Sequence, residues 1–106
     1  MGIFNSIFGG NNNNEDLTIL INEGAFLVDV RTAAEFAEGN VAGSTNIPLD
    51  QVANKIDRFK GKKNIIVFCR SGSRSSQAKA ILEQNGFNNV TNGGSWQEVN
   101  ASLKNK

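Results

Sequence analysis

The chain runs Asn64-Ile65-Ile66-Val67-Phe68-Cys69-Arg70-Ser71-Gly72-Ser73-Arg74-Ser75 through its most informative stretch. The apolar run that ends at Cys69 predicts a strand buried on both faces, and the spacing after it predicts a helix over residues 76–85. Cys69 is then expected between the carboxyl end of a strand and the amino end of a helix. The backbone N–H groups of residues 70–75 lack helical partners there, and the helix dipole adds positive potential. Such a turn stabilises a thiolate or a bound anion.

Composition narrows the classes of site and partner. The 106 residues, 39% of them hydrophobic, are enough for one globular domain with a modest core. Eleven basic and ten acidic residues give a net charge of +1, so neither nucleic acid nor a membrane surface is an expected partner. One cysteine and no histidine exclude an internal disulfide, a Cys/His zinc site and a Cys–His nucleophile pair. We expect no metal and no cofactor, and Cys69 must be activated by backbone groups and arginines.

The two ends of the sequence differ in character. Residues 1–14 are expected to form a short N-terminal segment and a Gly/Asn linker, and residues 15–106 a single domain. The first eight residues carry too little positive charge for a secretory signal, and no apolar run approaches membrane-spanning length. The predicted localisation is therefore cytoplasmic. Residues 1–6 also fit a myristoylation pattern, but a short amphipathic turn is the favoured interpretation.

Helical and strand-like segments alternate along the domain, which predicts an α/β fold with a parallel sheet. Helices are expected over residues 15–23, from Thr32, over 50–59 and 76–85, and from Ser95, and strands over 25–30, 45–47, 65–69 and 88–91. Thr32–Glu35 and Ser95–Glu98 are capping-box patterns. We expect four strands, or five if a segment ahead of Glu15 also pairs, with helices on both faces. Ligands are expected at the carboxyl edge of the sheet, where Cys69 lies.

Motifs in both halves of the domain occur in an order typical of one family. They are Asp29-Val30-Arg31, Glu35-Phe36, Gly39-Asn40-Val41-Ala42-Gly43-Ser44, Asn46-Ile47-Pro48, the loop Cys69 to Ser75, Gly86-Phe87, Val90, Gly93-Gly94 and Trp96. Together they resemble a single-domain rhodanese over residues 15–103, which implies a rhodanese-like α/β fold. The family usually has histidine at the position of Asn40. That departure is expected to affect structure more than chemistry.

The resemblance implies sulfurtransferase activity. The Cys69 thiolate would attack the outer sulfur of a donor such as thiosulfate, sulfite would leave, and a persulfide would remain for a thiol or cyanide to collect. The residues support this chemistry independently, because sulfite leaves as a stable anion and no general acid is needed. A low thiol pKa is needed instead. Residues 69–79 contain Arg70, Arg74 and Lys79 and no acidic residue, which favours the thiolate.

The loop residues have predicted roles. Cys69 is the nucleophile, and the expected substrate-binding residues are Arg70, Ser71, Gly72, Ser73, Arg74 and Ser75. Their N–H groups would form a cradle, with Arg70 and Arg74 as contacts for an anionic donor. Gly72 permits the bend, and the three serines are expected to hydrogen-bond the terminal sulfur or the backbone.

Residues outside the loop have structural alternatives. Asp29 and Arg31 follow the first strand at the same sheet edge, so they either support the pocket or form an ordinary ion pair or cap. Glu35 as a capping-box partner and Trp96 as the anchor of the last helix are expected to be structural. The basic run at residues 60–63 is expected to be a solvated turn without function.

Three functional classes remain open after one is disfavoured. Cysteine-dependent phosphatases and arsenate reductases use Cys-x5-Arg, whereas Arg74 gives Cys-x4-Arg here, a smaller ring of amides. A sulfurtransferase is favoured over a persulfide carrier in a protein relay and over a non-enzymatic interaction module, which the intact cysteine loop argues against. The expected partners are a small anionic sulfur donor and a thiol or cyanide acceptor, with a protein donor or acceptor as the alternative.

Overall fold

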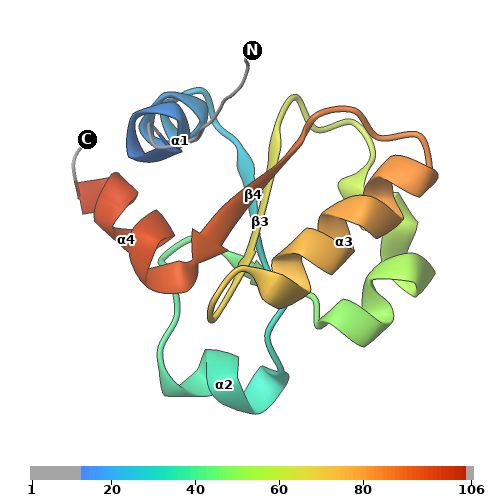
Figure 1. The fold of residues 1–106 in the computed structure, drawn as a ribbon, viewed down its shortest axis with the longest axis horizontal. Helices are drawn as coiled ribbons and strands as arrows, with labels where there is room; N and C mark the ends of the chain where they lie inside the picture. Colours follow the sequence, from blue (N-terminus) through green and yellow to red (C-terminus); the bar gives the residue numbers. More distant parts are fainter. Residues whose placement is uncertain (1–12, 105–106) are drawn as a thin grey trace.

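A four-stranded parallel sheet forms the centre of the computed structural model, which describes residues 13–104 (Figure 1). The strands are β1 (Phe26–Asp29), β2 (Thr45–Asn46), β3 (Ile65–Cys69) and β4 (Val90–Ser95), in the order β2-β1-β3-β4. The helices are α1 (Asn13–Asn22), α2 (Ala33–Glu38), the 3₁₀ helix η1 (Leu49–Phe59), α3 (Ser73–Gln84) and α4 (Trp96–Lys104). The predicted α/β fold with a parallel sheet is confirmed, and the described residues supply four strands.

Several expectations concern the amino end. The predicted amphipathic turn, the myristoylation pattern and residues 1–12 of the predicted segment and linker lie outside the described residues. A fifth strand ahead of Glu15 would have to come from residues 1–12, because α1 already begins at Asn13. That start is two residues earlier than predicted, which is the ordinary uncertainty of a helix boundary. Over residues 13–104, no helix is both long and apolar enough to cross a membrane.

Strand β3 is buried on both faces, as its apolar sequence predicts. All five of its residues are buried, and successive side chains of a strand point to opposite faces. Ile65, Val67 and Cys69 therefore pack into one cluster, whereas Ile66 and Phe68 pack into another. The strand separates two hydrophobic cores and supplies both.

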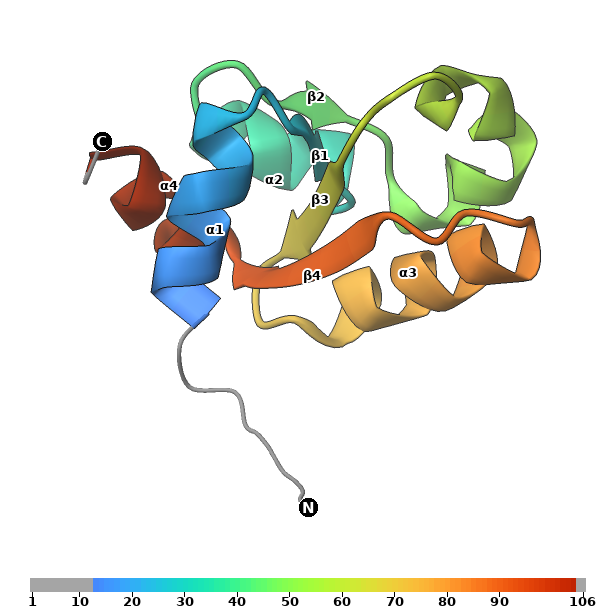
Figure 2. The same ribbon diagram turned by 90° about the horizontal axis from the view of Figure 1, so that it is seen from above.

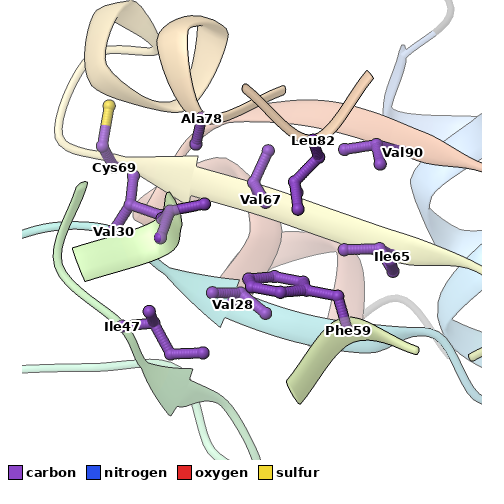
Figure 3. Close-up of a cluster of buried hydrophobic side chains, with 11 residues drawn as sticks. Val28, Val30, Ile47, Phe59, Ile65, Val67, Cys69, Ala78, Leu82 and Val90 are labelled. Atoms are coloured by element: carbon purple, nitrogen blue, oxygen red, sulfur yellow. The ribbon is translucent and has the colours of Figure 1, made fainter. Parts of the chain in front are cut away.

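Four of the helices in residues 13–104 cover the two faces in pairs (Figures 1 and 2). On the first face, Ala78 and Leu82 of α3 and Phe59 of η1 pack over β1 and β3 (Figure 3). On the second face, α1 and α4 lie together and contribute Leu17 and Val99. Burying each sheet face beneath a pair of helices is the standard way such a layer excludes water.

Two helices differ from their predicted form. The helix predicted over residues 50–59 is the 3₁₀ helix η1, interrupted at Lys55, whose φ and ψ of −124° and 32° are not helical. Long 3₁₀ runs are uncommon, and the kink divides this one into shorter pieces. Helix α3 starts at Ser73, three residues before the predicted start, because Gly72 takes a left-handed conformation with φ 96° and turns the chain directly into the helix.

Strand β4 covers Val90–Ser95, later than the predicted 88–91, and it contains a bulge that sequence patterns do not mark. Asn92 pairs with Val67 and Gly94 with Phe68, so Gly93 is an additional residue in β4. A Cβ at Gly93 would lie 2.8 Å from Ile66 Cγ2 and 2.9 Å from a Val99 methyl carbon. The close packing of β3, β4 and α4 therefore depends on this glycine.

Gly93→Ala is expected to lower the free energy of unfolding by about 2–3 kcal/mol, because the new methyl group overpacks a core that is already full. Urea unfolding followed by circular dichroism measures the change. Gly24→Ala is the uncrowded comparison, since a Cβ at Gly24 would meet nothing within 4 Å. Its φ of +90°, which Gly93 does not share, should alone cost about 1 kcal/mol. An equal loss in the two variants would contradict the packing argument.

Candidate active site

The predicted site lies at the point in the sheet where successive strands are added in opposite directions. From β1 the chain proceeds to β2 on one side, whereas from β3 it proceeds to β4 on the other. The carboxyl ends of β1 and β3 therefore lie at the switch point, which is the usual ligand position in such sheets. The loop from β3 to α3 and helix α2 both lie at this edge (Figure 1). Cys69 is the last residue of β3 and therefore lies at this edge.

The sulfur of Cys69 is enclosed by the start of α3. The Gly72 N–H donates to Cys69 Sγ at 3.1 Å, and Ser75 Oγ lies 3.5 Å from the same sulfur. The side chains of Cys69 and Ser75 are both buried, with Cys69 exposing 1% of its surface. The structure therefore brings three of the predicted site residues together around one atom.

The surroundings of Cys69 favour its thiolate. Burial of the thiol raises its pKa, but hydrogen bonding by the Ser75 side chain and by the backbone of Ser75, Ser71 and Gly72 acts more strongly in the other direction. The pKa of Cys69 therefore lies below its ordinary value. Backbone donors at the amino end of a helix are a recognised cause of a reactive cysteine.

Asn92 is a site residue that sequence reasoning missed. Its Oδ1 accepts hydrogen bonds from Ser75 Oγ at 2.7 Å and from the Gly94 N–H at 2.9 Å, while its Nδ2 donates to the Gly72 carbonyl at 3.2 Å. Asn92 thus holds both residues that approach the sulfur. The bulge in β4 directs this side chain toward α3. The only sequence signal is a polar residue directly before Gly93.

The guanidinium of Arg74, a predicted anion contact, faces a carboxylate. Its two terminal nitrogens donate to Glu35 Oε1 at 2.7 Å and Oε2 at 3.1 Å. Hydrogen bonding from Arg74, together with the Thr32 N–H, lowers the pKa of Glu35 to about 2, and the same contact raises the pKa of Arg74. Glu35 also closes the predicted capping box with Thr32, which is confirmed. Contact between Arg74 and a donor stays a prediction.

The other predicted loop contacts are exposed. The Ser71 and Ser73 side chains face solvent and form no side-chain hydrogen bond with another described residue. Arg70 lines a pocket of about 210 Å³ beside the loop. The remaining lining residues are Arg31, Glu35, Glu38, Gly39, Trp96 and Gln97. Binding of a donor by Arg70, Ser71 or Ser73 stays a prediction.

Asp29 and Arg31 form a buried ion pair at the end of β1. Arg31 Nη2 lies 2.7 Å from Asp29 Oδ2, and the two residues are 4% and 0% exposed. The same guanidinium donates to the Glu35 and Gly39 carbonyls and stacks on the Trp96 ring at 4.8 Å. The pair therefore anchors α2 and the start of α4 to the sheet edge. Arg31 also lines the pocket beside the loop, so the two expected roles are compatible.

Ser75→Ala is expected to raise the pKa of Cys69, because the thiolate loses a hydroxyl 3.5 Å away that stabilises it by turning its proton from Asn92 Oδ1 to the sulfur. The pH dependence of Cys69 alkylation by iodoacetamide measures the midpoint. Ser76→Ala is the matched control, since this adjacent side chain is exposed. A midpoint that stays unchanged or falls in Ser75→Ala would show that the hydroxyl does not stabilise the thiolate.

Known proteins share this sequence and arrangement. A sulfurtransferase of Allochromatium vinosum is 36% identical over 70 residues, which are 66% of this chain and 65% of that protein. Thiosulfate sulfurtransferase PspE of Escherichia coli K12 is 35% identical over 74 residues, covering 68% of this chain and 71% of that protein. The chain thus spans about two thirds of the length of these relatives.

Structural similarity leads to the same family. A solved structure of a rhodanese with anions from E. coli superimposes with a TM-score of 0.65 and 34% identity, covering 71% of this chain and 91% of that chain. A family model described as the rhodanese-like domain matches residues 13–102. With its parallel α/β fold and its cysteine loop at the sheet edge, the chain belongs to the rhodanese-like domain family.

Proposed function

We propose that this protein is a sulfurtransferase that carries a sulfane sulfur as a persulfide on Cys69. The observation that supports this most directly is the environment of the sulfur, with the Gly72 N–H at 3.1 Å and a lowered pKa. A lowered pKa makes the nucleophilic thiolate easier to form without a partner base. The names of the relatives, which include a thiosulfate sulfurtransferase, fit the same chemistry.

The proposed reaction has two displacement steps at sulfur. The Cys69 thiolate attacks the outer sulfur of thiosulfate, an S–S bond forms, and the S–S bond of the donor breaks with its electron pair leaving on sulfite. A thiolate or cyanide acceptor then attacks the terminal sulfur, and the Cys69 thiolate leaves with the bonding pair. Both leaving groups are stable anions, so neither step needs a proton from a general acid.

The geometry of the cysteine loop favours sulfur transfer over phosphate chemistry. Sulfur transfer needs a nucleophile and hydrogen-bond donors near the incoming sulfur, and the loop provides both through Cys69 and its backbone. Phosphate chemistry would use a larger amide ring closed by arginine at Cys-x5-Arg, and that position is Ser75. Arg74, one residue earlier, is engaged with Glu35. We therefore favour sulfur transfer over phosphate-ester hydrolysis.

Incubation with thiosulfate, and separately with cysteine persulfide, is expected to add one sulfur, about 32 Da, to the intact mass, because the intermediate is covalent. Cyanide should remove the added sulfur and yield thiocyanate. Cys69→Ser should abolish the adduct while keeping the unfolding midpoint. Thiocyanate formation measured in parallel with mass connects the adduct to transfer.

Two results would contradict the proposal. An adduct of equal yield in Cys69→Ser would show that the sulfur is bound at another residue. If neither thiosulfate nor cysteine persulfide gives an adduct, the protein does not accept sulfur from small molecules. An adduct that forms only from a protein persulfide would identify the chain as a carrier in a protein relay.

A further inference from the structure

The charges around the site are paired in a way that the loop sequence does not reveal. Arg74 and Glu35 form a bidentate ion pair, and their side chains are only 32% and 25% exposed. Partial burial limits screening by salt, and the paired hydrogen bonds fix the direction of the guanidinium. In the free protein, the carboxylate of Glu35 therefore largely neutralises the positive charge of Arg74.

The neighbouring pocket has no net charge of its own. Two arginines and two glutamates line it, namely Arg31, Arg70, Glu35 and Glu38. Arg31 is already paired with Asp29. Of the guanidinium groups at this edge in residues 13–104, only Arg70 lacks a carboxylate partner. The cradle at the sulfur is made of backbone dipoles, which supply positive potential without a full charge.

We propose that Glu35, by holding Arg74, makes the site favour sulfur donors of low net charge, such as the zwitterionic persulfide of an amino-acid thiol, over dianionic thiosulfate. Glu35 is a positioning residue in this view, because it acts through Arg74. The inference rests on the proposed sulfur transfer and names its substrate class. With a persulfide donor, the Cys69 thiolate takes the outer sulfur with its proton, and the donor thiolate leaves with the electron pair of the broken S–S bond.

Charge preference can be measured without sulfur transfer. Iodoacetate and iodoacetamide alkylate the same thiolate and differ by one negative charge, so the ratio of their rate constants at Cys69 reports the local potential. Glu35→Gln is expected to raise this iodoacetate-to-iodoacetamide ratio about threefold to tenfold, because Arg74 becomes free to attract an anion. The kcat/KM for thiosulfate relative to cysteine persulfide should rise by at least as much. Glutamine also closes a capping box, so α2 should be retained.

Two further variants define the cause. Glu83→Gln removes the same charge from the exposed far end of α3, where Glu83 pairs with Lys79, and it should leave both ratios unchanged. The double variant Glu35→Gln/Arg74→Gln should lose the gain of the single variant. A gain that survives in the double variant would show that Glu35 acts by its own charge and would overturn the role of Arg74.

The unmodified protein provides a test that does not depend on the folding of any variant. Arg31 and Arg74 are paired, and the one unpaired guanidinium at this edge in residues 13–104, Arg70, is exposed and contributes little. Raising the ionic strength from about 10 mM to about 500 mM should therefore change the alkylation ratio less than about twofold. A steep fall with salt would show that the Arg74 charge reaches the sulfur unpaired and would overturn the proposal. Unchanged ratios in a folded Glu35→Gln variant would do the same. If Cys69 forms no persulfide, the proposed sulfur transfer is contradicted, but the alkylation ratios still test the effect of Glu35 on the charge of the site.

Discussion

Strand β3 is buried on both faces and hydrogen-bonded on both sides, so its carboxyl end has a fixed position in the molecule. Cys69 takes its place from that strand, and its sulfur projects beyond it to the start of α3. The left-handed Gly72 lets α3 begin within four residues of the cysteine. A short, fixed turn of this kind keeps the N–H groups close to the sulfur, whereas a longer loop would allow them more positions.

The stabilisation of the thiolate comes mainly from groups that carry no formal charge. The donors near Cys69 belong to the backbone and to Ser75, and Asn92 in turn holds Gly72 and Ser75. Dipoles fixed by secondary structure need little rearrangement when charge develops on the sulfur. The charges of Arg31 and Arg74 are instead paired with Asp29 and Glu35 within the protein.

The ion pairs at the sheet edge form a connected series from β1 to α3. Asp29 orients Arg31, and Arg31 donates to the Glu35 carbonyl. The Glu35 carboxylate then binds Arg74 at the start of α3. One buried pair thus helps to position the partially exposed one that borders the active-site loop. The carboxylates of Asp29 and Glu35 therefore affect both the stability of this edge and the net charge beside the active-site loop.

Features that depend on neighbouring residues were determined by the sequence itself. The apolar run of β3, the two capping boxes and the cysteine loop were predicted because strand periodicity and helix caps involve residues only a few positions apart. The tertiary structure alone decided which distant groups meet. Glu35 and Arg74 are 39 residues apart, and Ser75 and Asn92 are 17 apart. Such pairs form only when packing places separate elements at one edge, so the direction of Arg74 and the charge of the site could not be derived from spacing.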